Sequence, residues 1–220
     1  MAKTIIRKIR MGRLKQNKKM KSLKEQLYKY VNNSTDPQIN FDLGLEYEKI
    51  GQTAAALSFY LRCAELTDNK TLAYESLLKT HKCVATQTRR PVFEQEQLIT
   101  ALTHLPQRPE AYLLLSLWHS AREEWKVSNS YAIQGLELAN LSLPPLNSDI
   151  GYAGHYALKF QKAFTCWWIG QRDLSLELWK ELFKDIHLIP KDTYYQVILN
   201  NCKNFDIIDE ETFNLLTTEE

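Results

Sequence analysis

The sequence is short of helix-breaking residues and of long apolar runs. Its 220 residues include only seven glycines and seven prolines. Leucine, alanine, glutamate, lysine and glutamine are abundant instead, and these residues favour helices. Alternating β-branched and polar residues are rare, so the composition disfavours a sheet protein and predicts an all-α fold. No apolar run approaches the roughly 20 residues of a membrane-spanning helix.

The sequence has few cysteines, and their spacing does not indicate disulfides or a metal site. The four of them contain no C-x-x-C motif and follow no pairing rhythm: Cys63, Cys83, Cys166 and Cys202. Each lies within a helical pattern, where a free cysteine behaves as a small buried residue. Widely spaced free cysteines suit a reducing compartment, so we expect a cytoplasmic location.

Catalytic and metal-binding patterns are missing as well. The five histidines are scattered, and no two form an H-x-x-x-H pair on one helical face. His81 and Cys83 are two residues apart, so they point to different sides of a helix and a zinc site would need two remote ligands. The sequence has no glycine-rich phosphate loop, no G-x-S-x-G and no paired-carboxylate motif. We therefore expect no metal, no cofactor and no enzymatic activity.

The best-defined pattern runs from Pro37 to Asp68. Small, aromatic and turn residues recur there at helical spacings: Gly44, Tyr47, Gly51, Ala56, Tyr60 and Cys63. Two helices approach closely only where a small residue meets a bulky one, which explains the alternation. Asp36 before Pro37 is a helix start. The segment resembles a tetratricopeptide (TPR) repeat, a 34-residue pair of antiparallel helices, and the resemblance implies a protein that binds partners rather than substrates.

The small-residue position of this unit recurs along the chain. It falls at intervals of 34, 38, 47 and 35 residues, at Gly44, Leu78, Ser116, Ala163 and Ile198. Each helix pair must stack on its neighbours to bury its apolar side. We predict a right-handed superhelical solenoid of about four to five TPR-like helix pairs over residues 34–205. The acidic segment 206–220 is expected either to cap the last helix or to stay loose.

Two short motifs carry a narrower resemblance. They are Arg108-Pro109-Glu110-Ala111 and Trp167-Trp168-Ile169-Gly170. The chain is similar in these motifs to TPR-type segments associated with glycosyltransferases of bacteria and marine phages. The resemblance implies an accessory component beside a glycosyltransferase, located in a virion if the protein is phage-encoded. The enzyme part is not implied, because the chain has no alternating strand–helix run and no D-x-D motif.

A partner-binding groove is expected on the inner face of the first helix of each pair. Projecting the repeat pattern places eleven residues there: Phe41, Leu45, Lys49, Glu75, Lys79, Lys82, Leu113, Leu117, Phe160, Phe164 and Trp168. A mixed apolar groove with a lysine patch suits an amphipathic helix or an extended peptide. The alternative is that the aromatic side chains, above all Trp167 and Trp168, form core between repeats. The carboxylate clamp of chaperone-binding TPR domains is disfavoured, since Phe41 and Leu45 replace its Lys and Asn.

The net charge of +2 conceals a basic N-terminal segment. Residues 1–30 hold eleven Lys and Arg and one acid, whereas residues 31–220 carry a net charge of −8. We predict that residues 1–33 form a basic arm followed by an amphipathic helix over 20–32 that caps the first repeat. The arm's charged side chains are expected to contact an anionic partner: Arg7, Lys8, Arg10, Arg13, Lys15, Lys18 and Lys19. A solvated tail that only confers solubility is the alternative.

These patterns together predict a non-catalytic scaffold for protein–protein interaction, which binds a peptide or helix in a TPR-like groove. Two alternatives remain open. One is an accessory component of a glycosyltransferase system. The other is an adaptor to nucleic acid or an anionic membrane surface through the basic arm.

Overall fold

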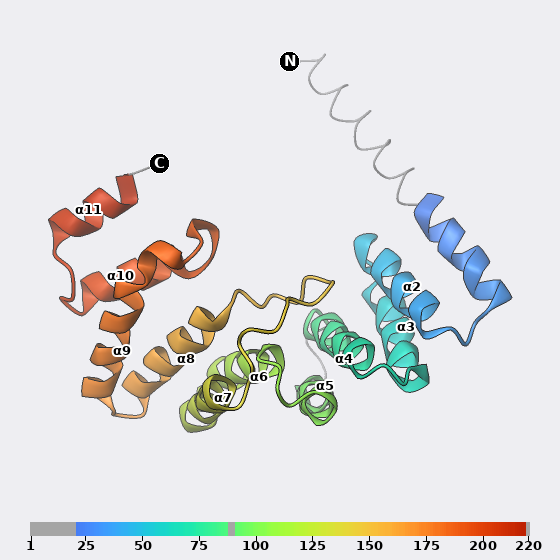
Figure 1. The fold of residues 1–220 in the computed structure, drawn as a ribbon, viewed down its shortest axis with the longest axis horizontal. Coiled ribbons are helices and arrows are strands. Elements are labelled where there is room, and N and C mark those ends of the chain that lie inside the picture. Colours follow the sequence, from blue (N-terminus) through green and yellow to red (C-terminus); the bar gives the residue numbers. More distant parts are fainter. Residues whose placement is uncertain (1–20, 88–90, 219–220) are drawn as a thin grey trace, which may run out of the picture. The chain divides into compact units, whose positions relative to one another are not determined.

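The computed structural model describes residues 21–87 and 91–218, which are helical and contain no strand (Figure 1). The predicted all-α class and the TPR-like helix pairs are confirmed. The chain divides into two compact units, residues 1–105 and 106–220. Among the described residues, no helix is both long enough and apolar enough to cross a membrane.

The first unit contains two helix pairs, and each helix packs against the next along the chain. The pairs are α2 (Pro37–Lys49) with α3 (Thr53–Leu66), and α4 (Lys70–Ala85) with α5 (Pro91–His104). Asp36 caps α2 as expected, because its carboxylate accepts a hydrogen bond of 3.1 Å from the Ile39 amide. Gly51 ends the turn after α2 with a φ of +80°, a value that favours glycine.

Close approach of α2 and α3 depends on Gly44. A Cβ atom added there would lie only 2.4 Å from the ring of Tyr60. Tyr60 is fully buried, and its ring is tilted against that of Phe41, with 5.6 Å between the ring centroids. The small residue on one helix therefore receives the aromatic ring of the other, as the TPR spacing predicted.

A further helix over residues 21–32 precedes α2 and packs against the first pair. Leu23 is buried, and the ring of Tyr30 meets Phe59 of α3 edge to face at 5.4 Å. The guanidinium of Arg62 lies over the Tyr30 ring at 5.8 Å. The predicted basic arm, with its residues from Arg7 to Lys19, lies outside the described residues.

The second unit continues the pattern of helix pairs. Its elements are α6 (Glu110–Ser120), α7 (Trp125–Glu137), α8 (His155–Trp168), α9 (Arg172–Lys184), the turn Ile186–Leu188, a kinked helical segment Lys191–Tyr195, α10 (Gln196–Asn204) and α11 (Glu210–Thr218). The long connection from α7 to α8 is hydrogen-bonded to the residues just before α6. Arg108 there is paired with Glu110 and donates a hydrogen bond of 2.9 Å to the carbonyl of Pro144.

Two helix crossings in this unit are closed by serine hydroxyls. Ser128 of α7 donates to the carbonyl oxygen of Ser116 at 2.7 Å, and Ser175 of α9 donates to that of Ala163 at 2.7 Å. Both contacts join residues 12 apart, the same separation as Gly44 and Ala56 in the first unit. A small residue therefore lies at each of these crossings, and the hydroxyl groups of Ser116, Ser128 and Ser175 all have hydrogen-bond partners.

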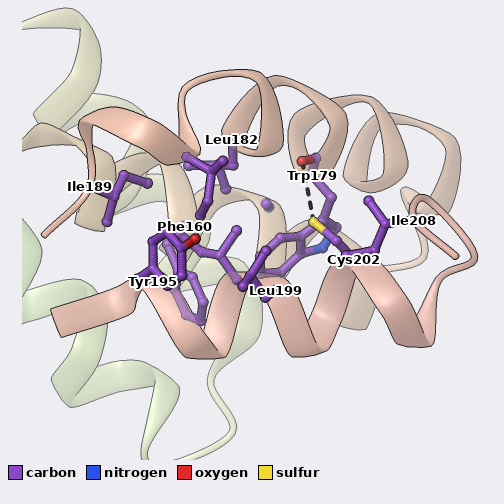
Figure 2. Packing of buried hydrophobic residues seen from close by; sticks show 11 residues of the cluster. Phe160, Trp179, Leu182, Ile189, Tyr195, Leu199, Cys202 and Ile208 are labelled. Carbon is purple, nitrogen blue, oxygen red and sulfur yellow. Dashed lines mark hydrogen bonds between the residues drawn. The ribbon is translucent and has the colours of Figure 1, made fainter. Parts of the chain in front are cut away.

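One buried hydrophobic cluster of the second unit lies between α8, α9 and α10 (Figure 2). Phe160 meets the fully buried Trp179 edge to face at 5.2 Å, and the Cys202 thiol donates to the Trp179 carbonyl at 3.7 Å. Phe213 and Leu216 of α11 pack against this cluster. Residues 210–218 of the expected acidic tail are therefore a helix that covers the last core, the first of the two alternatives.

We expect Gly44→Ala to destabilise the protein. Overpacking against the Tyr60 ring should lower the free energy of unfolding by about 1–3 kcal/mol. The better helix propensity of alanine, about 1 kcal/mol, offsets this only in part. Urea unfolding followed by circular dichroism measures the change.

Ser58→Ala is the matched control, because Ser58 is exposed on α3 of the same pair. Its effect should stay within about 0.5 kcal/mol. An unchanged unfolding midpoint for Gly44→Ala would contradict the close-approach account.

Candidate functional site

In the first unit, the predicted groove residue Lys79 belongs to an internal ion pair. Its ammonium group lies 2.8 Å and 3.1 Å from the two carboxylate oxygens of Glu48. The Tyr60 hydroxyl donates to the same carboxylate at 2.7 Å, and the ammonium of Lys82 is 4.0 Å away. Glu48 therefore ties α2, α3 and α4 together. The Lys79 side chain is only 5% exposed, so it offers no open positive charge.

The pKa of the Glu48 carboxyl group is lowered. Burial opposes its ionisation, but hydrogen bonds from Lys79 and Tyr60 outweigh burial and stabilise the carboxylate. Burial and the bond to Glu48 raise the pKa of the Tyr60 hydroxyl. At neutral pH this cluster is therefore a carboxylate held by a phenol and an ammonium group.

The predicted groove of the first unit is largely closed by packing. Phe41 and Glu75 are buried, and Leu45 packs against the cluster that contains Phe41. Lys49 and Lys82 keep exposed side chains, at 56% and 43%. The expected apolar anchors are absent from this face because the second pair covers them: Phe41 belongs to the same cluster as Cys83 of α4. Phe41, Glu75 and Lys79 are therefore not part of the binding surface that we propose below.

In the second unit, Leu113 and Phe160 are also core rather than surface. Phe160 lies inside the cluster of Figure 2. Leu117 and Phe164 are half-buried, whereas Trp168 is 54% exposed. Of the five predicted groove residues of this unit, Trp168 has the most accessible surface.

Trp168 belongs to a stacked pair that joins two helix pairs. Its ring lies 5.3 Å from that of Trp125, with an interplanar angle of 17°. Phe164 meets Trp125 edge to face at 5.8 Å. The start of α7 and the end of α8 thus form one aromatic surface.

A shallow cleft of about 430 Å³ opens beside these rings. It is lined by Glu123, Glu124, Trp125, Lys126, Val127, Trp168 and Ile169, and we call it the tryptophan cleft. Val127 is 43% exposed. The sequence pattern placed Trp168 in a groove but not Trp125 or the acidic residues. The sequence did contain a signal for Trp125. The first residue of the second helix is Thr53 in α3 and Arg172 in α9, so a tryptophan at this position in α7 differs from the other helix pairs.

Trp167 faces elsewhere. Its ring lies 4.6 Å from that of Phe205, after α10, and the guanidinium of Arg172 is 5.1 Å from its centroid. Each of the two sequence interpretations, core between repeats and groove surface, therefore fits one of the two tryptophans. Trp167 packs between helices, and Trp168 forms surface.

The turn before α7 has an unusual backbone. Glu123 adopts a φ of +60°, and the corresponding turns before α3 and α9 have Gly51 at +80° and Gly170 at +87°. The hydrogen bonding is the same: the amide of Glu124 donates to the His119 carbonyl at 3.0 Å, as Gln52 does to its own helix end at 2.9 Å. The chain thus carries glutamate in a left-handed position that favours glycine.

The cysteines are packing residues. Burial raises the pKa of Cys63 and Cys83 to about 11 and that of Cys202 to about 12, so the thiol form prevails at neutral pH. Across residues 21–87 and 91–218, no group of three His, Cys, Asp or Glu side chains is placed to hold a metal ion.

Comparisons with known proteins bear on the fold. No protein-family model matches the sequence. No curated protein matches it either. Solved structures do match. MamA of Desulfovibrio magneticus RS-1, from its residue 41 to its end, has a TM-score of 0.58 at 13% identity, covering 86% of this chain and 97% of that one. The MamA RS-1 ArsTM double mutant gives 0.58 at 13%, covering 82% and 92%.

A third match is TTC0263, a thermophilic TPR protein of Thermus thermophilus. Its TM-score is 0.53 at 16% identity, over 86% of this chain and 93% of that one. At such low identity these matches establish a TPR-like fold and leave function to the surfaces described above.

We expect Glu48→Gln to lower the free energy of unfolding at pH 7 by about 1–3 kcal/mol, because two hydrogen bonds would lose their charged acceptor. The pKa of Glu48 is lowered in the folded state, so its contribution is present above the ordinary value of 4.5 and is lost as the pH falls through the folded pKa. The gap between wild type and variant should therefore narrow below pH 4.5.

Urea unfolding at pH 7 and at a series of acidic pH values measures this gap. Glu65→Gln is the control, because Glu65 is an exposed acid of α3 in the same unit and should change stability by less than about 0.5 kcal/mol. A gap that is constant with pH would contradict the assignment to the Glu48 carboxylate.

Proposed function

We propose that the protein is a scaffold that binds another protein, with the tryptophan cleft as its anchor. The observation that carries the proposal is Trp168, which stacks on Trp125 and yet leaves 54% of its own surface exposed. Tryptophan is enriched among the residues that dominate binding energy at protein interfaces.

The physical argument is the cost of exposed aromatic surface. Stacking on Trp125 holds the Trp168 side chain, so little conformational entropy would be lost when a partner covers it. Val127 adds exposed apolar area on the same cleft. A central anchor of this kind contributes about 2 kcal/mol or more when a partner removes it from water.

The partner segment we propose is a helix or an extended peptide, the two forms that clefts between helices accept. The proposed action is binding rather than catalysis. In support, the described cysteines are buried, with raised pKa values, and so are poor nucleophiles at neutral pH.

A glycosyltransferase partner remains a hypothesis that rests on sequence resemblance. The structure supplies another reason for both motifs. Arg108 and Glu110 form a buried ion pair at the start of α6, and Gly170 ends α8 with a φ of +87°. These motif residues therefore have structural roles that any chain with this fold could need. The identity of the partner tests the hypothesis, and with it a cytoplasmic or virion location.

A second hypothesis is that the basic arm acts as an adaptor to nucleic acid or an anionic membrane. Its residues lie outside the part of the chain that the structure describes. Its signature would be binding to nucleic acid or anionic lipid that requires residues 1–19 and falls steeply with salt. A partner that survives a high-salt wash would favour the scaffold instead.

We expect Trp168→Ala to weaken partner binding by about 30-fold, the equivalent of about 2 kcal/mol. The measurement is affinity capture from the native cells with a high-salt wash, followed by titration of the identified partner. Circular dichroism verifies that the variant is folded.

Leu188→Ala is the matched control, because Leu188 is an exposed apolar residue of the same unit, at 70%, and does not line the cleft. It should bind like wild type. Retention of the partner by Trp168→Ala, at the affinity of Leu188→Ala, would rule out the cleft as the anchor.

A further inference from the structure

We infer that the tryptophan cleft accepts the lysine or arginine side chains of a basic peptide. The inference rests on the proposed function and adds the chemistry of the partner. It depends on three observations: the exposed aromatic surface, the charge around it and the backbone of Glu123.

The aromatic surface suits a cation. Trp168 and Trp125 are stacked at 5.3 Å, so each covers part of the other, and over half of Trp168 remains accessible. A guanidinium or ammonium group over a tryptophan face is attracted by the ring's quadrupole. The protein already uses this contact within α6 and its turn, where the Arg122 guanidinium lies 3.5 Å from the centroid of the Trp118 ring.

The charge around the cleft also favours a cation. Two of its lining residues are the exposed acids Glu123 and Glu124, against one base, Lys126. Glu124 is hydrogen-bonded to the His119 ring. Residues 106–220 contain 16 acidic and ten basic side chains, a net charge of −6. A basic segment would be steered toward this unit and would meet carboxylates beside the rings.

The position of Glu123 adds to the argument from charge. Its left-handed backbone is the conformation that Gly51 and Gly170 adopt in the corresponding turns. Glutamate there is unfavourable for folding, because its Cβ crowds the backbone. The described residues bear this cost at two such turns, at Glu123 and at Asp206 after α10, and Glu123 is the one that lines the cleft. We assign the carboxylate of Glu123 to the cleft rather than to the stability of the turn.

A purely apolar occupant fits less well. A helix that buried Trp168 with apolar side chains alone would also cover the neighbouring carboxylate of Glu123 and bring no cation to it. Burying an unpaired charge is costly. A basic side chain pairs with the acids and covers the ring at the same time.

The test uses the full-length protein and a defined probe. The probe is the peptide Lys-Thr-Ile-Ile-Arg-Lys-Ile-Arg-Met-Gly-Arg-Leu-Lys, the sequence of residues 3–15, labelled with a dye. It interleaves cations with apolar residues. The comparison peptide has glutamine at all six basic positions. Fluorescence anisotropy at low and high salt gives the two affinities. We expect the basic peptide to bind at least about tenfold more tightly, and to weaken as salt rises.

Variants locate the binding. Trp168→Ala, Glu123→Gln and Glu124→Gln should each weaken it several-fold. Glu137→Gln is the matched control, since Glu137 is an exposed acid of α7 that does not line the cleft, and it should bind like wild type. Glu123→Gly should weaken binding and yet raise the unfolding midpoint. A residue with only a structural role would not move the two readouts in opposite directions.

The outcomes separate this inference from the proposed function. Equal binding of both peptides, or binding that no cleft variant weakens, overturns the inference. The proposed function survives if the native partner still depends on Trp168. If the native partner is indifferent to Trp168 as well, both fail. Self-association of the protein that Trp168→Ala removes and salt weakens would support the inference, with a second copy supplying the basic segment.

Discussion

The close approach of paired helices at small residues is the constraint on which the rest of the structure depends. Gly44 admits the ring of Tyr60, and serine hydroxyls close the equivalent crossings at Ser116 and Ala163. Where two backbones nearly touch, the separation of 12 residues also fixes the length of the turn between the helices. That turn determines where the second helix begins. The position of Trp125, as the first residue of α7, follows from the same spacing that builds the core.

Sequence periodicity was sufficient for the helix pairs but not for the exposure of their side chains. The small-residue interval located α2, α6 and α8 to within a few residues, and Asp36 marked the start of α2. A period of 3.6 residues shows which side chains share a face, but it does not show whether a neighbouring pair covers that face. Phe41 and Phe160 were therefore expected in a groove and lie in cores. Lys79 was expected at the surface for the same reason.

The tryptophan cleft lay beyond sequence reasoning because its parts belong to different helix pairs. Trp125 and Trp168 are 43 residues apart, separated by the irregular connection between α7 and α8. That connection is longer than a repeat turn, and its path depends on the buried Arg108–Glu110 pair and the bond to Pro144. The sequence indicated two aromatic positions at separate repeat sites. Only the packing of α7 against α8 makes them neighbours.

At Glu123, the residue that would best stabilise the turn differs from the residue that the proposed binding requires. A left-handed residue other than glycine costs on the order of 1 kcal/mol, a considerable share of the roughly 5–15 kcal/mol that stabilises a typical domain. The turns after α2 and α8 avoid the cost with glycine, and each makes the same hydrogen bond to its helix end as the turn after α6. Because the geometry of the three turns is shared, the turn itself does not require glutamate. What distinguishes the third turn is its neighbour, an exposed tryptophan pair beside which a carboxylate can meet a cation. Asp206 after α10 adopts the same conformation outside the lining of the cleft, so the backbone alone does not indicate a ligand. The argument for a ligand of positive charge is the position of the Glu123 carboxylate beside the exposed tryptophan pair.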